Sequence, residues 1–379
     1  MVNIADIFRI HGPEYREKFG AWMLPSHLKA MEAIEQCRTE ALGGQVYLCE
    51  SCQELHYSYH SCKNRHCPTC QNGQGQKWLE EQKEMLLPVS YFMVTPDQAR
   101  GRLFTVPEEL RDLIRSHQKD LYNILFRASA AALQELACDP RFVGGKIGMH
   151  GLLQTWTRDM LYHPHVHYLV PGGGLSPDGS TWLPSREDFF VHVKPLSILF
   201  RAKFRDELKK TDLFLLVDPQ VWSKSWVVDC EPVGSGEEAF RYLAPYIFRV
   251  AITNNRILGL EDGKVTPDQA RGRLFEYKDS GTAQMKPCTL TAEDLIRRFL
   301  QHVLPDRFIK VRSYGFLAPS NRHLLEKIKE LLGGVSTPET ESAGKASDLK
   351  EPKDVLRCPL CGGILILVET IKPKSRLPT

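Results

Sequence analysis

The sequence predicts an α+β protein with a central antiparallel sheet, preceded by a small metal-binding module. Across residues 90–320, helical and strand patterns are mixed without the regular alternation typical of parallel sheets, which favours an antiparallel sheet. Residues 37–72 are rich in Cys, His, Gly and Asn and poor in aliphatic side chains, so bound metal must replace a hydrophobic core there. A further cysteine pair, Cys358 and Cys361, lies near the C-terminus.

Periodicity places the elements in order. Apolar residues at helical spacing, including Met31 and Ile34, predict a helix over 12–36, and helical character returns over 76–87 until Pro88. Apolar runs bounded by turn residues predict strands, and two of them joined by a short connection predict a hairpin. In the main domain the predicted elements are strand 90–94, one long or two short helices in 107–137, hairpin strands 146–159 and 165–173, helix 197–210, strand 225–233, helix 237–252, helix 290–304, strand 307–317 and helix 321–333.

Changes in composition divide the chain into four parts. Residues 334–356 are rich in Ser, Thr, Glu, Lys and Gly and nearly lack large apolar groups, which is typical of a disordered linker. The predicted parts are an N-terminal helix with the metal-binding module at 1–87, the main domain at 88–333, the linker at 334–356 and a short tail at 357–379.

Charge and hydropathy exclude some classes of protein. The 49 basic and 46 acidic residues give a net charge of +3, too near neutral to indicate a nucleic-acid binder by bulk charge. No apolar run reaches the roughly 18 residues of a membrane span, and the N-terminus lacks the pattern of a secretory signal. An odd total of 11 cysteines with CxxC spacing favours thiolate metal ligands in a reducing cytoplasm over disulfides.

One segment, VTPDQARGRLF, occurs identically at 94–104 and 265–275. Two distant copies do not make a structural period. We interpret them as the same octapeptide, PDQARGRL, inserted into two strand contexts, and both copies are therefore predicted to be protruding loops.

The cysteine-rich stretch has the spacing of a zinc ribbon. Cys49 and Cys52 form one CxxC pair, and Cys67 and Cys70 form a second after 14 intervening residues. Thiolates at i and i+3 in a tight turn can both face one ion, so these four residues are predicted to bind a structural zinc.

The remaining ligand candidates leave a second zinc site open. Cys37, Cys62 and His66 could contribute to it, although spacing does not fix the fourth ligand. The tail sequence CPLCGG at 358–363 supplies only two ligands, so it needs partners from elsewhere or is a remnant. Lys63 and Arg65, between the cysteine pairs, are candidates for contacts with DNA phosphates or belong to a solvated loop.

Three histidines alternate along one predicted strand. Residues two apart on a strand point to the same face, so His165 and His167 project together, and His163 precedes them at the same spacing. Two imidazoles on one face can chelate a divalent cation, so this strand is predicted to carry a metal site.

Two tyrosines share one face of the predicted helix 237–252. Tyr242 and Tyr246 are four residues apart, a spacing that suits core packing as well as a paired chemical role. Arg241 and Arg249 beside them are candidates for DNA contacts. A metal ion near a tyrosine would stabilise the transition state of phenol attack on a phosphodiester, giving a covalent protein–DNA bond that can later be rejoined.

The sequence resembles a known family at this point: the HUH-type, two-tyrosine rolling-circle transposases of the insertion-sequence ninety-one group. The resemblance covers nearly the whole chain. It rests on CRTEALGGQVYLCESC (37–52), YHSCKNRHCPTCQ (59–71), HPHVHYLVPGGGLS (163–176), YLAPYIFRVAITNNRI (242–257) and VRSYGFL (311–317).

The resemblance implies a zinc module for DNA recognition followed by a palm-like HUH nuclease domain. In that domain His165-Val166-His167 would be the HUH motif, with Mg²⁺ or Mn²⁺ as the catalytic ion and His163 as a candidate third ligand. Tyr242 and Tyr246 match the catalytic tyrosine pair of the family.

The predicted function is a transposase that nicks and rejoins single-stranded DNA through a 5′-phosphotyrosine intermediate during rolling-circle transposition. Its expected partners are single-stranded and hairpin DNA at the element ends and target, together with the host replication machinery. The expected location is the bacterial cytoplasm, in association with the nucleoid. Two alternatives remain: a plasmid or phage replication initiator or relaxase with the same chemistry, and a catalytically inactive zinc-dependent DNA-binding protein.

Overall fold

A computed structural model describes residues 2–71, 80, 83–95, 106–157, 159–226, 228–248, 250–257, 264–265, 276–278, 285–288, 290–333 and 356–374. The chain divides into two compact units, Met1–Gln71 with Thr337–Thr379, and Asn72–Ser336. The mixed helices and strands confirm the α+β prediction.

The N-terminal unit begins with two helices, α1 (Ile4–Phe19) and α2 (Pro25–Gln36). The single helix predicted over 12–36 was wrong, because a 3₁₀ turn at Gly20–Trp22 and Pro25 at the start of α2 interrupt it. The break leaves Trp22 exposed, and the two helices bury other apolar residues. Those residues are Ile4, Ile7, Phe8, Ala30, Met31 and Ile34.

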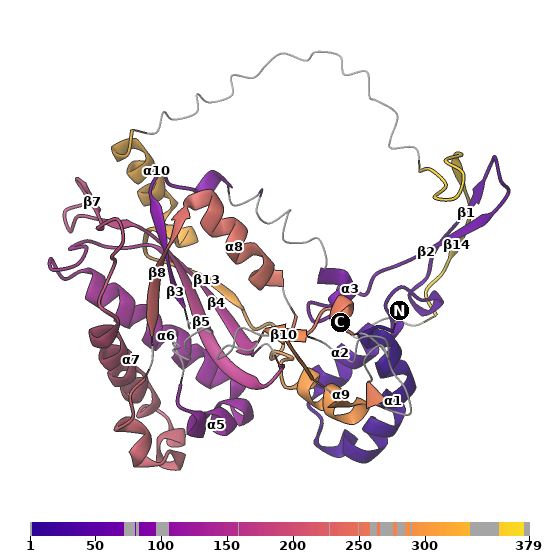
Figure 1. The fold of residues 1–379 in the computed structure, drawn as a ribbon, viewed down its shortest axis with the longest axis horizontal. Coiled ribbons are helices and arrows are strands. Elements are labelled where there is room, and N and C mark those ends of the chain that lie inside the picture. The colour runs from indigo at the N-terminus through magenta and orange to yellow at the C-terminus, as the bar shows by residue number, and fades with distance from the viewer. Residues whose placement is uncertain are drawn as a thin grey trace. The chain divides into compact units, whose positions relative to one another are not determined.

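A three-stranded antiparallel sheet follows in the same unit. Strands β1 (Gly44–Cys49) and β2 (Leu55–Tyr59) form a hairpin, and β14 (Leu365–Ile371), from the other end of the chain, pairs with the free edge of β1 (Figure 1). A short helix, α3 (Pro68–Gln71), comes after the hairpin. The C-terminal residues, predicted to be a separate tail, are therefore part of the N-terminal unit.

The second unit is built on a five-stranded antiparallel sheet in the order β13-β4-β5-β3-β8. Its central strands β4 (Met149–Trp156) and β5 (Tyr162–Pro171) form the predicted hairpin and are buried throughout. The other strands are β3 (Ser90–Thr95), β8 (Asp229–Ser235) and β13 (Val311–Tyr314). Antiparallel pairing on all sides confirms the predicted sheet type.

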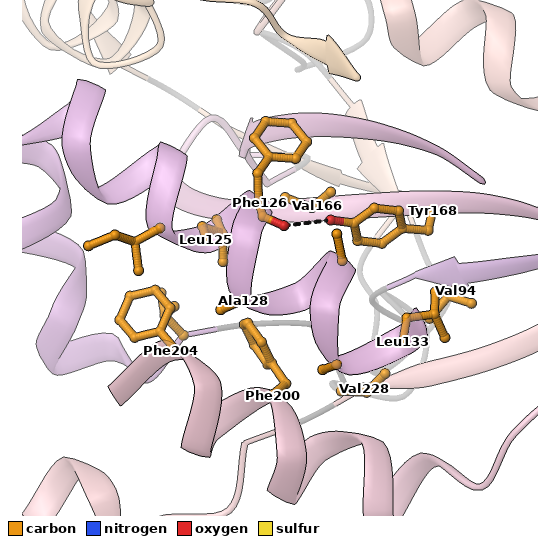
Figure 2. Close-up of a cluster of buried hydrophobic side chains, with 14 of the residues drawn as sticks. Val94, Leu125, Phe126, Ala128, Leu133, Val166, Tyr168, Phe200, Phe204 and Val228 are labelled. Atoms are coloured by element: carbon orange, nitrogen blue, oxygen red, sulfur yellow. Dashed lines mark hydrogen bonds between the residues drawn. The ribbon is translucent and has the colours of Figure 1, made fainter. Parts of the chain in front are cut away.

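One face of this sheet is covered by two long helices, α6 (Gln118–Ala137) and α7 (Val193–Leu208). Figure 2 shows the core between them, where Val166 and Tyr168 of β5 meet Leu125, Phe200 and side chains of neighbouring elements. The Tyr168 hydroxyl lies 3.3 Å from the carbonyl oxygen of Phe126 and 2.8 Å from the Ser129 hydroxyl, so the buried polar group is satisfied.

The opposite face is covered by α8 (Gly236–Phe248) (Figure 1). Ala239, Phe240 and Ile247 of this helix pack in a second core cluster with Tyr91, Met93, Leu152 and Leu169 of the sheet. Residues two apart share a sheet face, so Leu169 stands on the face of His163, His165 and His167. The helix thus lies on the histidine face.

The remaining elements are shorter. They are α5 (Arg111–Ser116), β6 (Gly173–Leu175), β7 (Trp182–Pro184), β9 (Lys264–Val265), β10 (Glu276–Lys278), β11 (Met285–Pro287), β12 (Leu290–Thr291), α9 (Ala292–Leu300) and α10 (Arg322–Leu331).

Some predictions concern residues outside the described parts. The repeated octapeptides, the linker 334–356 except its last residue, and half of the helix predicted over 76–87 fall there. Within the described residues, no helix is both long and apolar enough to cross a membrane.

Candidate functional site

The three histidines of β5 form one row of buried imidazoles. His163, His165 and His167 are 4%, 0% and 7% exposed. Their ring centroids are spaced 5.2 Å and 4.8 Å apart along the strand. The predicted strand began at 165, whereas β5 begins at Tyr162 and therefore includes all three histidines.

Gln154, which the sequence analysis did not single out, joins the row from the neighbouring strand. It pairs with His165 in the β4–β5 ladder. Its Oε1 lies 3.1 Å from Nε2 of His165 and 2.7 Å from Nε2 of His167. A glutamine directly after Leu152 and Leu153 in a predicted strand was the available signal, since a buried amide needs polar partners.

The protonation of His165 follows from its other nitrogen. Nδ1 lies 2.6 Å from the carbonyl oxygen of His163, and a carbonyl only accepts, so Nδ1 carries the proton. The neutral ring then presents a lone pair at Nε2 towards Gln154 Oε1, which is also an acceptor. Two acceptors at this distance repel each other. A cation bound by both atoms would remove the repulsion, and so would a Gln154 amide turned so that its NH₂ group donates to Nε2. Fixing a histidine through Nδ1 is typical of metal ligands.

Three potential ligand atoms therefore converge: Nε2 of His165, Nε2 of His167 and Oε1 of Gln154. Two imidazole nitrogens with one oxygen suit a divalent ion such as Mn²⁺. The three imidazoles themselves do not meet. Among the described residues, the groups of three or more His, Cys, Asp or Glu ligands whose atoms lie within 4.8 Å of one another consist of cysteines alone.

Burial sets the electrostatics of the row. It lowers the pKa of His165 to about 4, because the interior disfavours the charged imidazolium. Burial also lowers the pKa of His167, and the charges of His165 and Lys310 lower it further. All three rings are therefore neutral near pH 7, the state in which imidazole binds metal.

Lys310 links the histidine row to α8. Its Nζ donates a hydrogen bond of 3.0 Å to the carbonyl oxygen of Ile247, in the last turn of α8. The same ammonium lies 5.1 Å from the ring centroid of Trp156, at the end of β4. The positive charge of Lys310 also contributes to the lowered pKa of His167.

Tyr242 and Tyr246 both belong to α8, and the helix continues past them to Phe248. Their side chains are outside the described part of the structure, so their roles remain predictions. Of the arginines predicted to contact DNA, Arg241 is exposed and pairs with Glu237 at 2.9 Å, and Arg249 is not among the described residues.

The cysteines of the N-terminal unit form a complete four-thiol cluster. Cys37, Cys62, Cys67 and Cys70 bring their sulfur atoms within 4.8 Å of one another. Three of the sulfur–sulfur distances are 3.5, 3.5 and 3.6 Å. Tetrahedral zinc with bonds of about 2.3 Å places its sulfur ligands roughly 3.8 Å apart, so the cluster has the dimensions of a zinc site.

A second four-thiol cluster combines Cys49 and Cys52 with Cys358 and Cys361 from the C-terminal segment. Cys49 Sγ lies 3.4 Å from Cys361 Sγ, and Cys52 Sγ lies 3.7 Å from Cys358 Sγ. The backbone N–H of Cys52 stabilises the Cys49 thiolate and lowers the pKa of Cys49 to about 6.

These clusters correct the predicted zinc ligand set. Cys49 and Cys52 do not share an ion with Cys67 and Cys70, and neither cluster includes His66. The hairpin explains the separation. Cys49 and Cys52 lie at its turn, whereas Gly44 and Tyr59 pair at its open end, about 17 Å away along five strand residues. No single ion spans that length.

Lys63 and Arg65 lie between Cys62 and Cys67 of the first cluster, and both are exposed. Their assignment as contacts with DNA phosphates stays a prediction.

The histidine row and the first cysteine cluster lie in segments that match two known protein families. Residues 7–95 match the family model described as "Transposase zinc-binding domain", and residues 148–323 match the one described as "Putative transposase". The first match contains the complete cysteine cluster, so zinc is the expected metal of this unit. The second contains the histidine row and α8.

Two curated proteins match along most of the chain. "Putative transposase y4qJ" of Sinorhizobium fredii (strain NBRC 101917 / NGR234) is 36% identical over 97% of this chain and 95% of its own length. "Transposase for insertion sequence element IS801" of Pseudomonas savastanoi pv. phaseolicola is 28% identical over 88% of this chain and 82% of its own length. No solved structure matches the chain significantly. With a zinc-binding domain of the IS91 type and full-length relatives among transposases, the chain belongs to the IS91 family of transposases.

Proposed function

We propose that this transposase nicks and rejoins single-stranded DNA by tyrosine attack, with a divalent ion held by His165, His167 and Gln154. The observation that carries the proposal is the position of α8, which packs on the histidine face of the sheet. Had the helix packed on the opposite face with α6 and α7, the tyrosines and the histidines would be separated by the sheet.

The spacing of α8 supports a role for both tyrosines at this face. Ala239 is fully buried in the cluster that the helix forms with the sheet. Tyr242 and Tyr246 follow it by three and seven residues, so all three positions belong to one stripe of the helix. Position 246 lies within roughly 20° of Ala239 around the helix axis.

The direction of α8 supports the same conclusion. Gly236 begins the helix beside Tyr91, which pairs with Pro171 at the end of β5. Phe240 lies 5.6 Å from the ring of His150, the partner of Leu169. The helix therefore runs opposite to β5, and seven further residues advance about 10 Å, or about three strand residues. That advance carries its last turn towards the level of His167.

The ligand set that we propose for the catalytic ion differs from the one expected from the sequence. His165 and His167 are retained, Gln154 takes the place of His163, and the carbonyl oxygen of His163 fixes the His165 ring. A bound Mg²⁺ or Mn²⁺ would polarise the scissile phosphate and stabilise the charge of the transition state. Without the ion, a turned Gln154 amide would donate to Nε2 of both imidazoles and hold them in register.

In the proposed step a tyrosine oxygen bonds to the phosphorus and the bond from phosphorus to the 3′ oxygen breaks. The phenol loses its proton and the leaving 3′ oxygen gains one. The phosphotyrosine conserves the energy of the phosphodiester, so a 3′ hydroxyl can reverse the reaction on another strand. Two tyrosines allow a second transfer while the first remains covalently occupied, which suits a rolling-circle mechanism with single-stranded and hairpin DNA ends and the host replication machinery as partners.

The test uses overlapping labelled single strands that cover the DNA flanking the gene, with Mn²⁺ and the full chain. We expect an adduct that survives SDS, carrying label from 3′-labelled strands and releasing it from 5′-labelled strands. The variant Tyr242→Phe/Tyr246→Phe should form none. Tyr47→Phe, in the N-terminal sheet, is the matched control and should react like the parent.

Each outcome has a meaning. An adduct that persists in the double tyrosine variant would refute the assignment of the nucleophiles. Salt-sensitive binding without any adduct would indicate an inactive DNA-binding protein, since phosphate contacts alone give a strongly salt-dependent shift. An adduct that carries the label of 5′-labelled strands would show that the tyrosine bonds to the 3′ end of the cleaved strand, which is opposite to the proposed polarity.

A further inference from the structure

We propose that Cys49, Cys52, Cys358 and Cys361 form a second zinc site, whose bound metal holds the C-terminal strand β14 on β1. The matched zinc-binding family covers residues 7–95 and so assigns no role to Cys358 or Cys361. The inference concerns the N-terminal unit and does not rest on the tyrosine chemistry proposed for the other unit.

Ligand number is the first argument. The N-terminal unit has six cysteines between Cys37 and Cys70, and four of them complete the first cluster. Cys49 and Cys52 are then two ligands short of a tetrahedral site. The knuckle Cys358-Pro-Leu-Cys361 supplies two thiols and needs two more. Cys361 Sγ lies 3.4 Å from Cys49 Sγ, and Cys358 Sγ lies 3.7 Å from Cys52 Sγ.

The local geometry of both knuckles suits metal binding. The N–H of Gly362 donates to the carbonyl oxygen of Cys358 at 2.9 Å, which closes the tight turn that presents both thiols. Gly362 has φ +77°, a conformation that glycine adopts without strain. His56 Nε2 lies 3.2 Å from Cys358 Sγ, close enough to stabilise a metal-bound thiolate.

The two ends of the chain fit closely around this site. The N–H of Glu50 donates to the carbonyl oxygen of Ile364 at 3.0 Å. A Cβ at Gly363 would stand 2.8 Å from Ser51 Cβ and 3.0 Å from Cys49 Sγ, so only glycine allows this approach. The ladder then continues from Cys49, opposite Leu365, to Gly44, opposite Ile371.

Packing alone gives β14 little support. Ile366, Leu367 and Val368 remain 45%, 49% and 51% exposed, so the strand buries little apolar surface on β1. The two cysteine pairs are more than 300 positions apart in the chain. A weakly packed edge strand at the end of so long a connection needs a further bond, and a shared zinc ion provides it.

The two zinc sites should differ in lability. Cys37, Cys62 and Cys67 are buried, whereas Cys361 is exposed in the second cluster. Chelators reach the exposed site first, so removal of that metal should release β14 while the first cluster keeps its zinc. The C-terminal segment is thus a metal-dependent part of the N-terminal unit rather than a remnant.

The experiment measures zinc per chain and protection of β14 in the reduced full-length protein. We expect two zinc ions in the parent and one in Cys358→Ser/Cys361→Ser, with faster amide exchange confined to β1 and β14. The double variant is needed because His56, whose Nε2 is close to Cys358 Sγ, could replace a single lost thiolate as a zinc ligand. The matched control Cys138→Ser, at an exposed cysteine outside both clusters, should keep two zinc ions.

A chelator titration keeps the proposal falsifiable if the variant folds poorly. Zinc should leave the parent in a fast and a slow phase, and the fast phase should coincide with the loss of protection in β14. Two zinc ions retained in the double variant, one zinc ion in the parent, or simultaneous release of both ions would each overturn the proposal.

Discussion

At the scale of single residues, the most informative side chain is Gln154, because one amide oxygen contacts both imidazoles of the proposed metal site. We expect Gln154→Leu to weaken Mn²⁺ binding by at least about 10- to 100-fold, because loss of a direct ligand should cost no less than loss of a group that supports a ligand. Calorimetric titration of the DNA-free protein measures the change independently of activity.

Gln154→Glu is the matched variant, since it keeps an oxygen at the same place and adds a charge that favours the cation. It should bind Mn²⁺ at least as well as the parent. Normal binding by Gln154→Leu together with loss of binding in His163→Ala would restore His163 as the third ligand.

His302 provides a pH-dependent contribution to stability. It is 4% exposed, its Nε2 lies 3.1 Å from the carbonyl oxygen of Met160, and its Nδ1 lies 3.2 Å from the Thr155 hydroxyl. Burial lowers the pKa of His302 to about 4, and the nearby charge of Arg115 acts in the same direction. The unfolded chain, with a histidine pKa of about 6.5, therefore binds more protons between these values.

The stabilising contribution of neutral His302 is therefore complete above pH 6.5 and is lost as the pH falls towards 4. We expect the free energy of unfolding of His302→Gln to fall less than that of the parent over this range, by an amount on the order of 3 kcal/mol. Urea unfolding at several pH values measures the difference. Parallel curves for parent and variant would contradict it.

At the scale of elements, α7 is held by its buried aromatic residues. Phe200 and Phe204 are fully buried and lie 5.1 and 5.2 Å from the ring of Trp226. We expect Phe204→Ala to lower the free energy of unfolding by about 3–5 kcal/mol, because it removes apolar contacts and leaves a cavity. Denaturant titration of the full chain measures the loss.

Ile198 lies on the same helix but is 51% exposed, so Ile198→Ala is the control. Its effect should stay within about 0.5 kcal/mol. Equal losses in the two variants would mean that α7 does not pack through its phenylalanine face.

At the scale of the whole molecule, the two units depend on different sources of stability. The sheet of the second unit rests on large apolar clusters, whereas the N-terminal sheet lies between two cysteine clusters. We expect exhaustive zinc removal to unfold the N-terminal unit, since bound metal supplies folding free energy, and to leave the second unit folded.

Limited proteolysis of the zinc-depleted full chain tests this. Cleavage should fall within residues 2–71 and 356–374, while the core strands β4 and β5 remain protected. Cys67→Ser, in the buried cluster, should reproduce the effect of the chelator, and Cys138→Ser should not. Simultaneous digestion of both units would show that their stabilities are linked.

Features that depend on local periodicity and ligand chemistry could be predicted from the amino-acid sequence. Alternation predicted the β4–β5 hairpin and the shared face of its histidines, and helical spacing placed Tyr242 and Tyr246 on one helix, which the structure describes as α8. The helix over 12–36 failed because apolar spacing alone did not register the break at Gly20–Trp22. Cysteine type and CxxC spacing singled out the cysteines between Cys37 and Cys70 as candidate zinc ligands but not their grouping, and the role of Cys358 and Cys361 stayed open.

Contacts between groups that are distant in the chain could be read only from the fold. The length of the β1–β2 hairpin separates two cysteine pairs that look adjacent in sequence, and β14 brings Cys358 and Cys361 to the other end of the chain. Cross-strand register places Gln154 beside His165, and packing of Ala239 and Ile247 puts α8 on the histidine face. Register and packing depend on contacts between segments far apart in the chain, whereas periodicity depends on neighbours, and a single sequence displays only the latter.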